Sequence, residues 1–159
     1  MITLGINATY HDCSACLVQD GIVIAAAEEE RFTRIKHGKR PVPFTTWQLP
    51  FHAIDYCLQE AGIRLADVHH VAYSYAPDLL LGVHDDDATI QLPLEPSRHV
   101  SEWSSPWHPL FLSYLVNAPR QLAGGAPDHL QARLRVVSHD TPDPPYQWHF
   151  VEHHLAHEA

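Results

Sequence analysis

The fold is decided by residues 2–30, whose sequence is ITLGINATYHDCSACLVQDGIVIAAAEEE. Three runs of apolar residues rich in β-branched or small side chains predict three strands, over 2–7, 14–18 and 22–27. Asp20-Gly21 separates the second and third runs. This pair favours a type I′ hairpin turn, because both central residues of that turn need positive φ. The stretch therefore predicts a three-stranded antiparallel meander.

A helix and a further strand are predicted after the meander. From Phe51 to Gly62, apolar residues recur at spacings of three and four, with Pro50 before them and Gly62 as the C-cap. Residues 67–75 then form a short β-rich run that Pro77 ends. The first 76 residues therefore predict an α/β fold in which the antiparallel meander is followed by alternating helix and strand.

The middle of the chain has a different composition. Residues 76–145 hold ten of the 13 prolines, and we interpret them as an insertion. Within it, residues 107–122 have helical periodicity, although Pro119 would kink or end that helix. A fifth strand is predicted over 148–151, and the first turns of a helix over 153–159. Such a helix lacks a C-terminal cap and a following strand, so we expect the chain to be a truncated N-terminal fragment.

Charge and composition exclude several classes of partner. The formal net charge of −9 argues against general affinity for nucleic acid or anionic membranes. The longest apolar stretches are far shorter than the roughly 20 residues that a membrane span needs. The N-terminus has no signal-peptide pattern, so a cytoplasmic location is expected. Cys13 and Cys16 match C-x-x-C, but no second pair accompanies them, and we interpret them as small buried residues.

Half of the ten Lys and Arg residues, both lysines included, lie within ten positions: Arg31, Arg34, Lys36, Lys39 and Arg40. Such focusing in an acidic protein suggests an anionic ligand, because Arg offers a bidentate fork and Lys a mobile point charge to a phosphate. The alternative is a solvated loop whose cations offset the acidic run over residues 28–30. The sequence leaves both interpretations open.

The loop over residues 7–12 joins the first two predicted strands. A tight turn there can aim backbone N–H groups at a phosphate. His11 can act as a general base near neutral pH, with Asp12 orienting it or binding a hydroxyl. An ordinary polar loop is the alternative interpretation.

His153 and His157 form an H-x-x-x-H pattern. On a helix this spacing places two imidazoles on one face, about 5–6 Å apart at Cβ, which suits one metal ion. About one such pair is expected by chance among 14 histidines, and His149 with His153 is a second instance. The position of the pattern strengthens it, because ligands gather where strands of an α/β sheet end.

Three segments together carry a resemblance to a known family: residues 4–38, LGINATYHDCSACLVQDGIVIAAAEEERFTRIKHG; the FHAIDYCLQEAGI helix; and the terminal FVEHHLAHEA. They resemble the O-carbamoyltransferases, which include nodulation and antibiotic-tailoring enzymes, over roughly residues 2–76 and 147–159. The N-terminal domain of that family is similar to the tRNA threonylcarbamoyl-transferase subunit. The resemblance therefore implies the first half of a ribonuclease-H-like fold of the actin/Hsp70 type, in which a meander, a helix, a strand, a helix and a strand follow one another.

The resemblance also implies a reaction in two stages. Carbamoyl phosphate and ATP give carbamoyl adenylate in a C-terminal adenylate-forming domain that is absent from residues 1–159. The carbamoyl group then passes to a hydroxyl of a small-molecule acceptor, a sugar or a natural product. By resemblance, His11 is catalytic, Asp12 and Lys36 bind substrate, and His153 and His157 bind a divalent metal, expected to be iron, whose remaining ligand is an Asp in the absent portion.

Two kinds of function thus remain from the sequence. The first is a carbamoyltransferase in the complete protein, in which case the isolated fragment is expected to be inactive. The second is a non-catalytic half-domain that binds a metal or a partner and is completed by another chain. Neither needs nucleic acid or a membrane.

Overall fold

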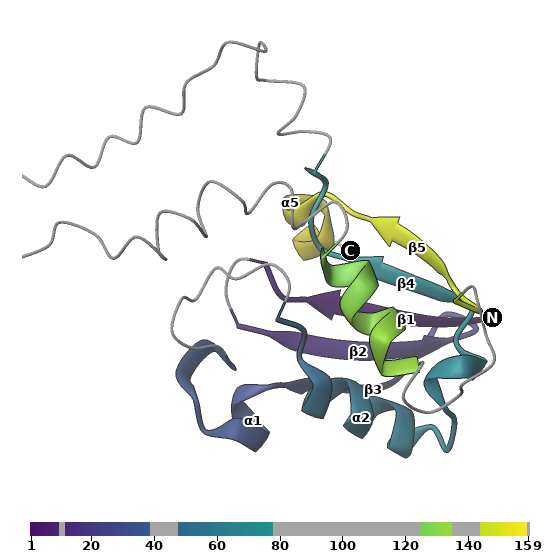
Figure 1. Cartoon of the computed structure of the whole chain (residues 1–159), viewed down its shortest axis with the longest axis horizontal. Helices are drawn as coiled ribbons and strands as arrows, with labels where there is room; N and C mark the ends of the chain where they lie inside the picture. Colours follow the sequence, from purple (N-terminus) through teal and green to yellow (C-terminus); the bar gives the residue numbers. More distant parts are fainter. Residues whose placement is uncertain (10–11, 39–47, 78–124, 135–143, 159) are drawn as a thin grey trace, which may run out of the picture.

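The computed structural model describes residues 1–9, 12–38, 48–77, 125–134 and 144–158, and Figure 1 shows their arrangement. One five-stranded sheet has the order β3-β2-β1-β4-β5. Its strands are β1 (Ile2–Asn7), β2 (Ser14–Gln19), β3 (Ile22–Glu28), β4 (His70–Tyr73) and β5 (Gln147–Phe150). The first three strands pair antiparallel, whereas β4 runs parallel to β1 and β5 parallel to β4. The fold is therefore mixed α/β, as predicted.

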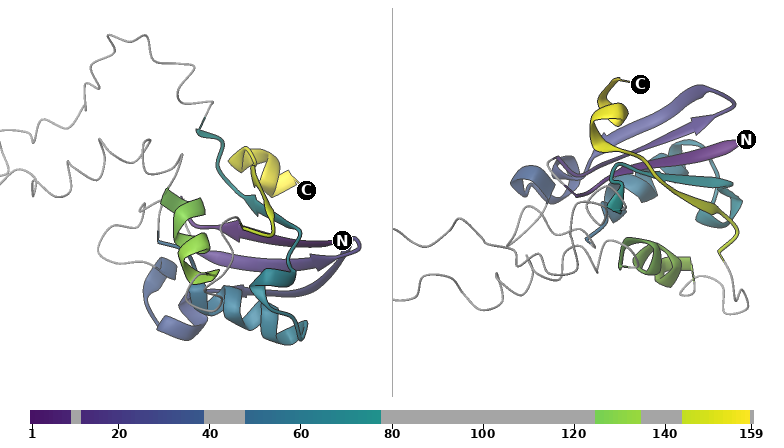
Figure 2. Two further views of the ribbon diagram at one scale, coloured as in Figure 1. Left: turned by 45° about the vertical axis from the view of Figure 1, so that its right-hand side comes forward. Right: turned by 90° about the horizontal axis from the view of Figure 1, so that it is seen from above.

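Helices lie on both faces of this sheet, as the two views in Figure 2 show. The helical elements are α1 (Glu30–Thr33), η1 (Lys36–Gly38), α2 (Phe51–Glu60), η2 (Leu65–Asp67), α5 (His153–Glu158) and the helical residues 125–134. Helix α2 and residues 125–134 cover one face, and α5 lies on the other. No helix in these described ranges is long and apolar enough to cross a membrane.

The two faces of the sheet differ because side chains alternate along each strand. In β1, Leu4 and Ile6 are buried beneath α2 and residues 125–134, whereas Thr3 and Gly5, which alternate with them, are half-exposed on the other side. We call these the covered face and the open face. The same alternation continues in β2, where Leu17 is fully buried and Cys16 is not.

The predicted meander is confirmed with boundaries that differ by a residue at most. Strands β1, β2 and β3 pair antiparallel as expected, with one register irregularity between Leu17 and Val18, and Asp20 and Gly21 both have positive φ, of 50° and 82°. Helix α2 begins at Phe51 as predicted and ends at Glu60. Gly62, two residues after Glu60, has a φ of 65° and turns the chain out of the helix.

The fourth strand is shorter than the predicted 67–75 because a 3-10 turn occupies its start. The Asp67 carboxylate accepts a hydrogen bond from the Arg64 N–H at 2.9 Å and so closes η2. The backbone N–H and guanidinium of Arg64 hold the pKa of Asp67 below its usual value. Strand β4 therefore begins only at His70.

A helix that sequence analysis missed lies within the range interpreted as an insertion. Residues 125–134 are helical, and Ala126, Leu130 and Leu134 at spacings of four belong to the buried core. Pro127 is tolerated because it lies in the first turn. Part of the 76–145 range therefore builds the core, while the helix predicted over 107–122 lies outside the described residues.

Candidate functional site

Polar side chains meet where β1 and β4 end. These neighbouring strands are parallel, so their carboxyl ends lie at the same edge of the sheet. The Ser74 hydroxyl donates a hydrogen bond to Asn7 Oδ1 at 2.6 Å, and the buried Thr9 hydroxyl donates to the Tyr73 hydroxyl at 2.8 Å. The first loop is thus anchored to β4.

Asp12 joins this loop to residues 34–38, the basic segment that follows α1. Its backbone oxygen accepts a hydrogen bond from Asn7 Nδ2 at 3.3 Å. Its carboxylate Oδ1 lies 2.9 Å from His37 Nδ1. In addition, the backbone N–H of Cys13 donates to the His37 carbonyl at 3.3 Å. Two segments that are 25 residues apart are therefore held together, and Lys36 lies directly beside the junction.

The backbone of the junction is strained. Asp12, Arg34 and His37 all have positive φ, of 45°, 57° and 62°, a conformation that side-chain-bearing residues adopt at a cost of order 1–3 kcal/mol. Gly38 follows with φ of 71°, and a Cβ there would lie 2.9 Å from Glu29 Cβ. Only glycine therefore fits at this position.

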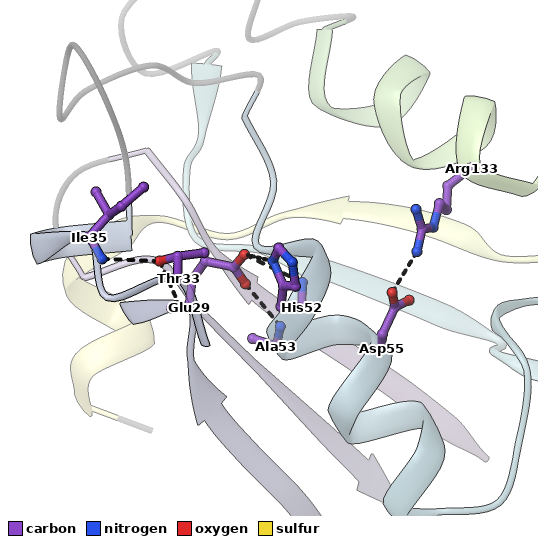
Figure 3. A network of polar contacts seen from close by, with 7 residues as sticks. All are labelled: Glu29, Thr33, Ile35, His52, Ala53, Asp55 and Arg133. Atoms are coloured by element: carbon purple, nitrogen blue, oxygen red, sulfur yellow. Dashed lines mark hydrogen bonds and ion pairs between the residues drawn. The ribbon is translucent and has the colours of Figure 1, made fainter. Parts of the chain in front are cut away.

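Glu29 is buried and binds the start of α2, as Figure 3 shows. Its Oε2 accepts a hydrogen bond from the Ala53 N–H at 2.9 Å, and its Oε1 lies 2.5 Å from His52 Nδ1. The carboxylate thus caps an N-terminus whose own N-cap residue, Pro50, offers no side-chain hydrogen bond. Of the acidic run that the neighbouring cations were expected to offset, Glu28 pairs with Arg31 at 3.7 Å, whereas the buried Glu29 binds the start of α2.

Figure 3 also shows three further contacts near this cap. Thr33 donates to the Glu29 carbonyl at 3.1 Å and accepts from the Ile35 N–H at 3.3 Å, which orders the turn after α1. Arg133 forms an ion pair with Asp55 at 2.5 Å and so ties the helical residues 125–134 to α2. The basic segment therefore rests on a scaffold joined to the covered face.

Helix α5 carries the predicted metal pair. Glu152 precedes it and accepts a hydrogen bond from the Leu155 N–H at 2.8 Å, and the backbone N–H groups of His154 and Leu155 hold the pKa of Glu152 below its usual value. His153 is half-buried in the first turn. His157 lies one turn later in the same helix, but its side chain is outside the described part of the structure. The spacing thus suits a shared metal.

A cavity of about 870 Å³ lies over the open face. Its floor consists of small residues in register across the sheet, including Gly5, Cys16 and Ala72. Asn7 lines the cavity and also holds the Asp12 loop, while Ala156 brings α5 to its border. The cavity is therefore continuous with the polar edge of the sheet.

The predicted site residues fall into two groups. Asp12 contacts His37, which follows Lys36 in the chain, and His153 and His157 share α5. His11 lies outside the described residues. In the described ranges, no three His, Cys, Asp or Glu side chains form a group that could hold a metal, so the metal site stays a prediction.

Sequence reasoning missed His37, which contacts Asp12. The sequence signal for His37 was its position between Lys36 and Gly38. Because the chain has 14 histidines, one histidine in such a position does not indicate a functional site. Asn7 and Ser74 were missed as a pair because their contact depends on the alignment of β1 with β4.

The fold and the site define a mixed α/β domain with an antiparallel meander whose polar groups gather at the carboxyl ends of parallel strands. A model of the family described as the carbamoyltransferase N-terminus matches residues 2–82, half of the chain. The chain belongs to this family.

The similar curated proteins are much longer than the matched segment. Nodulation protein NolNO of Sinorhizobium fredii is 48% identical over 67 residues, which are 42% of this chain and 9% of NolNO. The Synechocystis protein sll1178 is 46% identical over 74 residues, which are 46% of this chain and 11% of sll1178. A 19.2 kDa protein of Rhizobium etli is 45% identical over 67 residues, 42% of this chain and 34% of its own length. The chain therefore spans only a small part of these relatives.

Among solved structures, YeaZ from Pseudomonas aeruginosa matches 48% of this chain and 31% of its own chain, with a TM-score of 0.34 and 19% identity.

Proposed function

We propose that this chain supplies the acceptor side of a carbamoyl-transfer site in a longer protein. In the proposed reaction, carbamoyl phosphate, water and ATP give carbamoyl adenylate, phosphate and pyrophosphate in an adenylate-forming domain outside this chain. The carbamoyl group is then transferred to a hydroxyl of a small-molecule acceptor, a sugar or a natural product. Membership in the carbamoyltransferase N-terminus family is the observation that carries this proposal.

The geometry of the junction supports the placement of the reaction. Asp12 and Lys36 come from segments far apart in sequence, yet the Asp12–His37 contact brings those segments together. Lys36 is exposed, so its ammonium is accessible to a ligand. A cation beside a polar loop is the arrangement that a carbamoyl or phosphate oxygen requires.

The proposed transfer step balances in atoms and charge. The acceptor oxygen forms a bond to the carbamoyl carbon, and His11 takes the hydroxyl proton. The bond from the carbamoyl carbon to the phosphate oxygen breaks, and AMP leaves. Lys36 stabilises the negative charge that develops on the carbonyl oxygen, while Asp12 binds the acceptor hydroxyl.

We propose His153 and His157 as the protein ligands of a divalent metal, with iron as the expected ion. Imidazole is a suitable ligand for iron, and the pair is one turn apart in α5. A bound metal would polarise the carbamoyl carbonyl. Within the chain, Glu152 fixes the first turn of α5, which orients His153.

We also propose that the sheet is the first half of a ribonuclease-H-like fold. The order β3-β2-β1-β4-β5, with a meander on one side and parallel strands on the other, supports it. The complete domain would continue beyond α5.

A second candidate function is a non-catalytic half-domain that binds a metal or is completed by another chain. The open face favours it, because the sheet presents a cavity and small side chains there. This candidate predicts a metal in the 159-residue chain, or a partner on its sheet, without carbamoyl transfer.

The test is a carbamoylation assay on the longest natural form of the protein. The assay contains ATP, carbamoyl phosphate with a labelled carbon, and a panel of sugar and natural-product acceptors. We expect label in one acceptor together with release of AMP. Transfer of label to none of the acceptors, with stoichiometric metal that is lost from a His153→Ala/His157→Ala variant, would favour the half-domain instead.

Two lysine variants sharpen this test. Lys36→Ala should lower kcat/KM at both low and moderate salt. The loss should correspond to about 2–4 kcal/mol of transition-state stabilisation, the range of a lost preorganised contact. Lys39→Ala is the matched control and should cost under about 1 kcal/mol, largely masked by added salt. Equal, salt-sensitive losses would mean that the basic segment only attracts anions.

A further inference from the structure

His37 is held in place by more contacts than an exposed loop residue needs. Its ring Nδ1 lies 2.9 Å from the Asp12 carboxylate. Its backbone N–H donates to Glu30 Oε2 at 3.0 Å, and its carbonyl accepts from the Cys13 N–H. Three separate groups therefore fix one residue whose side chain is 43% exposed.

The conformation of His37 costs free energy that these contacts must offset. Its φ of 62° places a side-chain-bearing residue in the left-handed region. Gly38, packed against Glu29 and Cys13, continues the turn and fixes the end of the segment. Such strain persists only where the surroundings determine it, and it is concentrated at functional sites.

The contacts of His37 have one common effect on the proposed site. Lys36 precedes His37 directly, so the orientation of the His37 backbone sets the position from which the Lys36 side chain extends. Asp12 lies in the loop after β1, so the ring contact sets the position of that part of the loop. A change at His37 thus moves both sides of the proposed ligand site relative to each other.

We propose that His37 is a positioning residue that holds the basic segment against the loop after β1, so that Lys36 and Asp12 face one ligand. The inference rests on the proposed carbamoyl transfer. It assigns His37 no bond to the substrate: the residue acts through Asp12 and Lys36.

Three variants separate the ring contact from the backbone strain. His37→Asn keeps both features, since its side-chain amide can donate from about the position of Nδ1 and Asn tolerates positive φ. His37→Gly keeps the backbone conformation but removes the ring contact. Asp12→Ala removes the same contact from the other side. His69→Ala is the matched control, because the exposed His69 also uses its Nδ1, accepting from the Ile2 N–H at 3.1 Å at the opposite end of the sheet.

The first experiment tests the Asp12–His37 contact without activity, on the 159-residue chain. In amide NMR spectra, Asp12→Ala should shift the resonances of residues 34–38, and His69→Ala should leave them in place. Unmoved resonances in Asp12→Ala would overturn the inference, whatever the activity of the longer protein. This experiment therefore tests the Asp12–His37 contact separately from the proposed carbamoyl transfer.

The second experiment is a double-mutant cycle on kcat/KM for acceptor carbamoylation in the longest natural form. His37→Gly and Asp12→Ala should each lower kcat/KM by about 10²-fold, the scale of a misplaced reacting group. The double variant should lose little more than Asp12→Ala alone, because Asp12→Ala already removes the contact through which His37 acts. His37→Asn should recover most of the rate, and carbamoyl-adenylate formation should be unchanged throughout. The positioning role would be overturned if the losses in kcat/KM of the two single variants multiplied in the double variant. Failure of His37→Asn to recover the rate, or an equal loss in carbamoyl-adenylate formation, would also overturn it.

Discussion

The covered and open faces of the sheet are built from the same strands but have opposite chemistry. The covered face buries large apolar side chains such as Leu4, Leu17 and Tyr73 beneath α2 and residues 125–134. The open face presents Gly5, Cys16 and Ala72, with polar groups at its carboxyl edge and the cavity above it. One face therefore stabilises the fold, and the other leaves room for a ligand or a further element.

The difference shows how this fold separates stability from function. Alternation along β1 and β2 sends every second residue to the core, so the remaining residues are not constrained by core packing. The proposed site draws on that second set and on the loops beyond it. Changes on the two faces should consequently have different effects, and adjacent residues offer matched comparisons.

The largest difference is expected between Leu17→Ala and Val18→Ala. Leu17 is fully buried on the covered face, so its truncation should lower the free energy of unfolding by about 2–5 kcal/mol. Val18, its half-exposed neighbour, lines the open cavity, and its truncation should cost about 1 kcal/mol or less. Urea unfolding followed by circular dichroism measures both. Similar losses would mean that the open face is packed as tightly as the covered one.

The next effect is expected at Glu29, which links β3 to α2. Glu29→Ala removes the cap from the α2 N-terminus and should cost about 1–2 kcal/mol. Glu28→Ala is the control, because Glu28 is exposed and has only a 3.7 Å surface pair with Arg31; we expect a change within about 0.5 kcal/mol. Thermal unfolding of the two variants measures both losses of stability, and equal losses would contradict the capping role of Glu29.

A smaller effect, on the open face itself, is expected from Gly5→Ala. A Cβ at Gly5 would lie 2.6 Å from Cys16 Sγ, so the thiol must move, and we expect a cost of about 1 kcal/mol. Cys16→Ala should relieve the clash, and the double variant should be more stable than the sum of the single changes predicts. Strict additivity in denaturant unfolding would show that no such contact exists.

The smallest effect at neutral pH concerns the thiols. Burial raises the pKa of Cys57, on the buried side of α2, from 9.0 to about 11, and burial also raises the pKa of Cys16. Because the folded state keeps the Cys57 proton to higher pH than the unfolded chain does, the contribution of Cys57 to stability is complete below pH 9 and decreases as the pH rises toward 11. Iodoacetamide labelling of Cys57, followed by mass spectrometry, should accelerate up to about pH 11. A plateau near pH 9 would contradict the raised pKa.

Much of the fold could be predicted from local patterns. The three strands of the meander, the Asp20-Gly21 turn and the start of α2 at Phe51 each depend on residues that are neighbours in sequence. The helix over 125–134 was missed, since prolines dominate its surroundings and only three apolar positions at spacings of four mark it. Of the candidate site, the sequence analysis named Asp12 and Lys36 but not His37, which contacts Asp12 and follows Lys36 in the chain.

The sequence by itself determined the periodicity of the elements, the hairpin and the focusing of cations after β3, because each of these is a property of adjacent residues. Only the tertiary structure decided that Glu29 is buried against α2, that Asn7 contacts Ser74 and that Asp12 pairs with His37. These contacts span from 24 to 67 residues of chain. Their partners are chosen by the parallel alignment of β1 with β4 and by the packing of α2, and neither can be read from any single stretch.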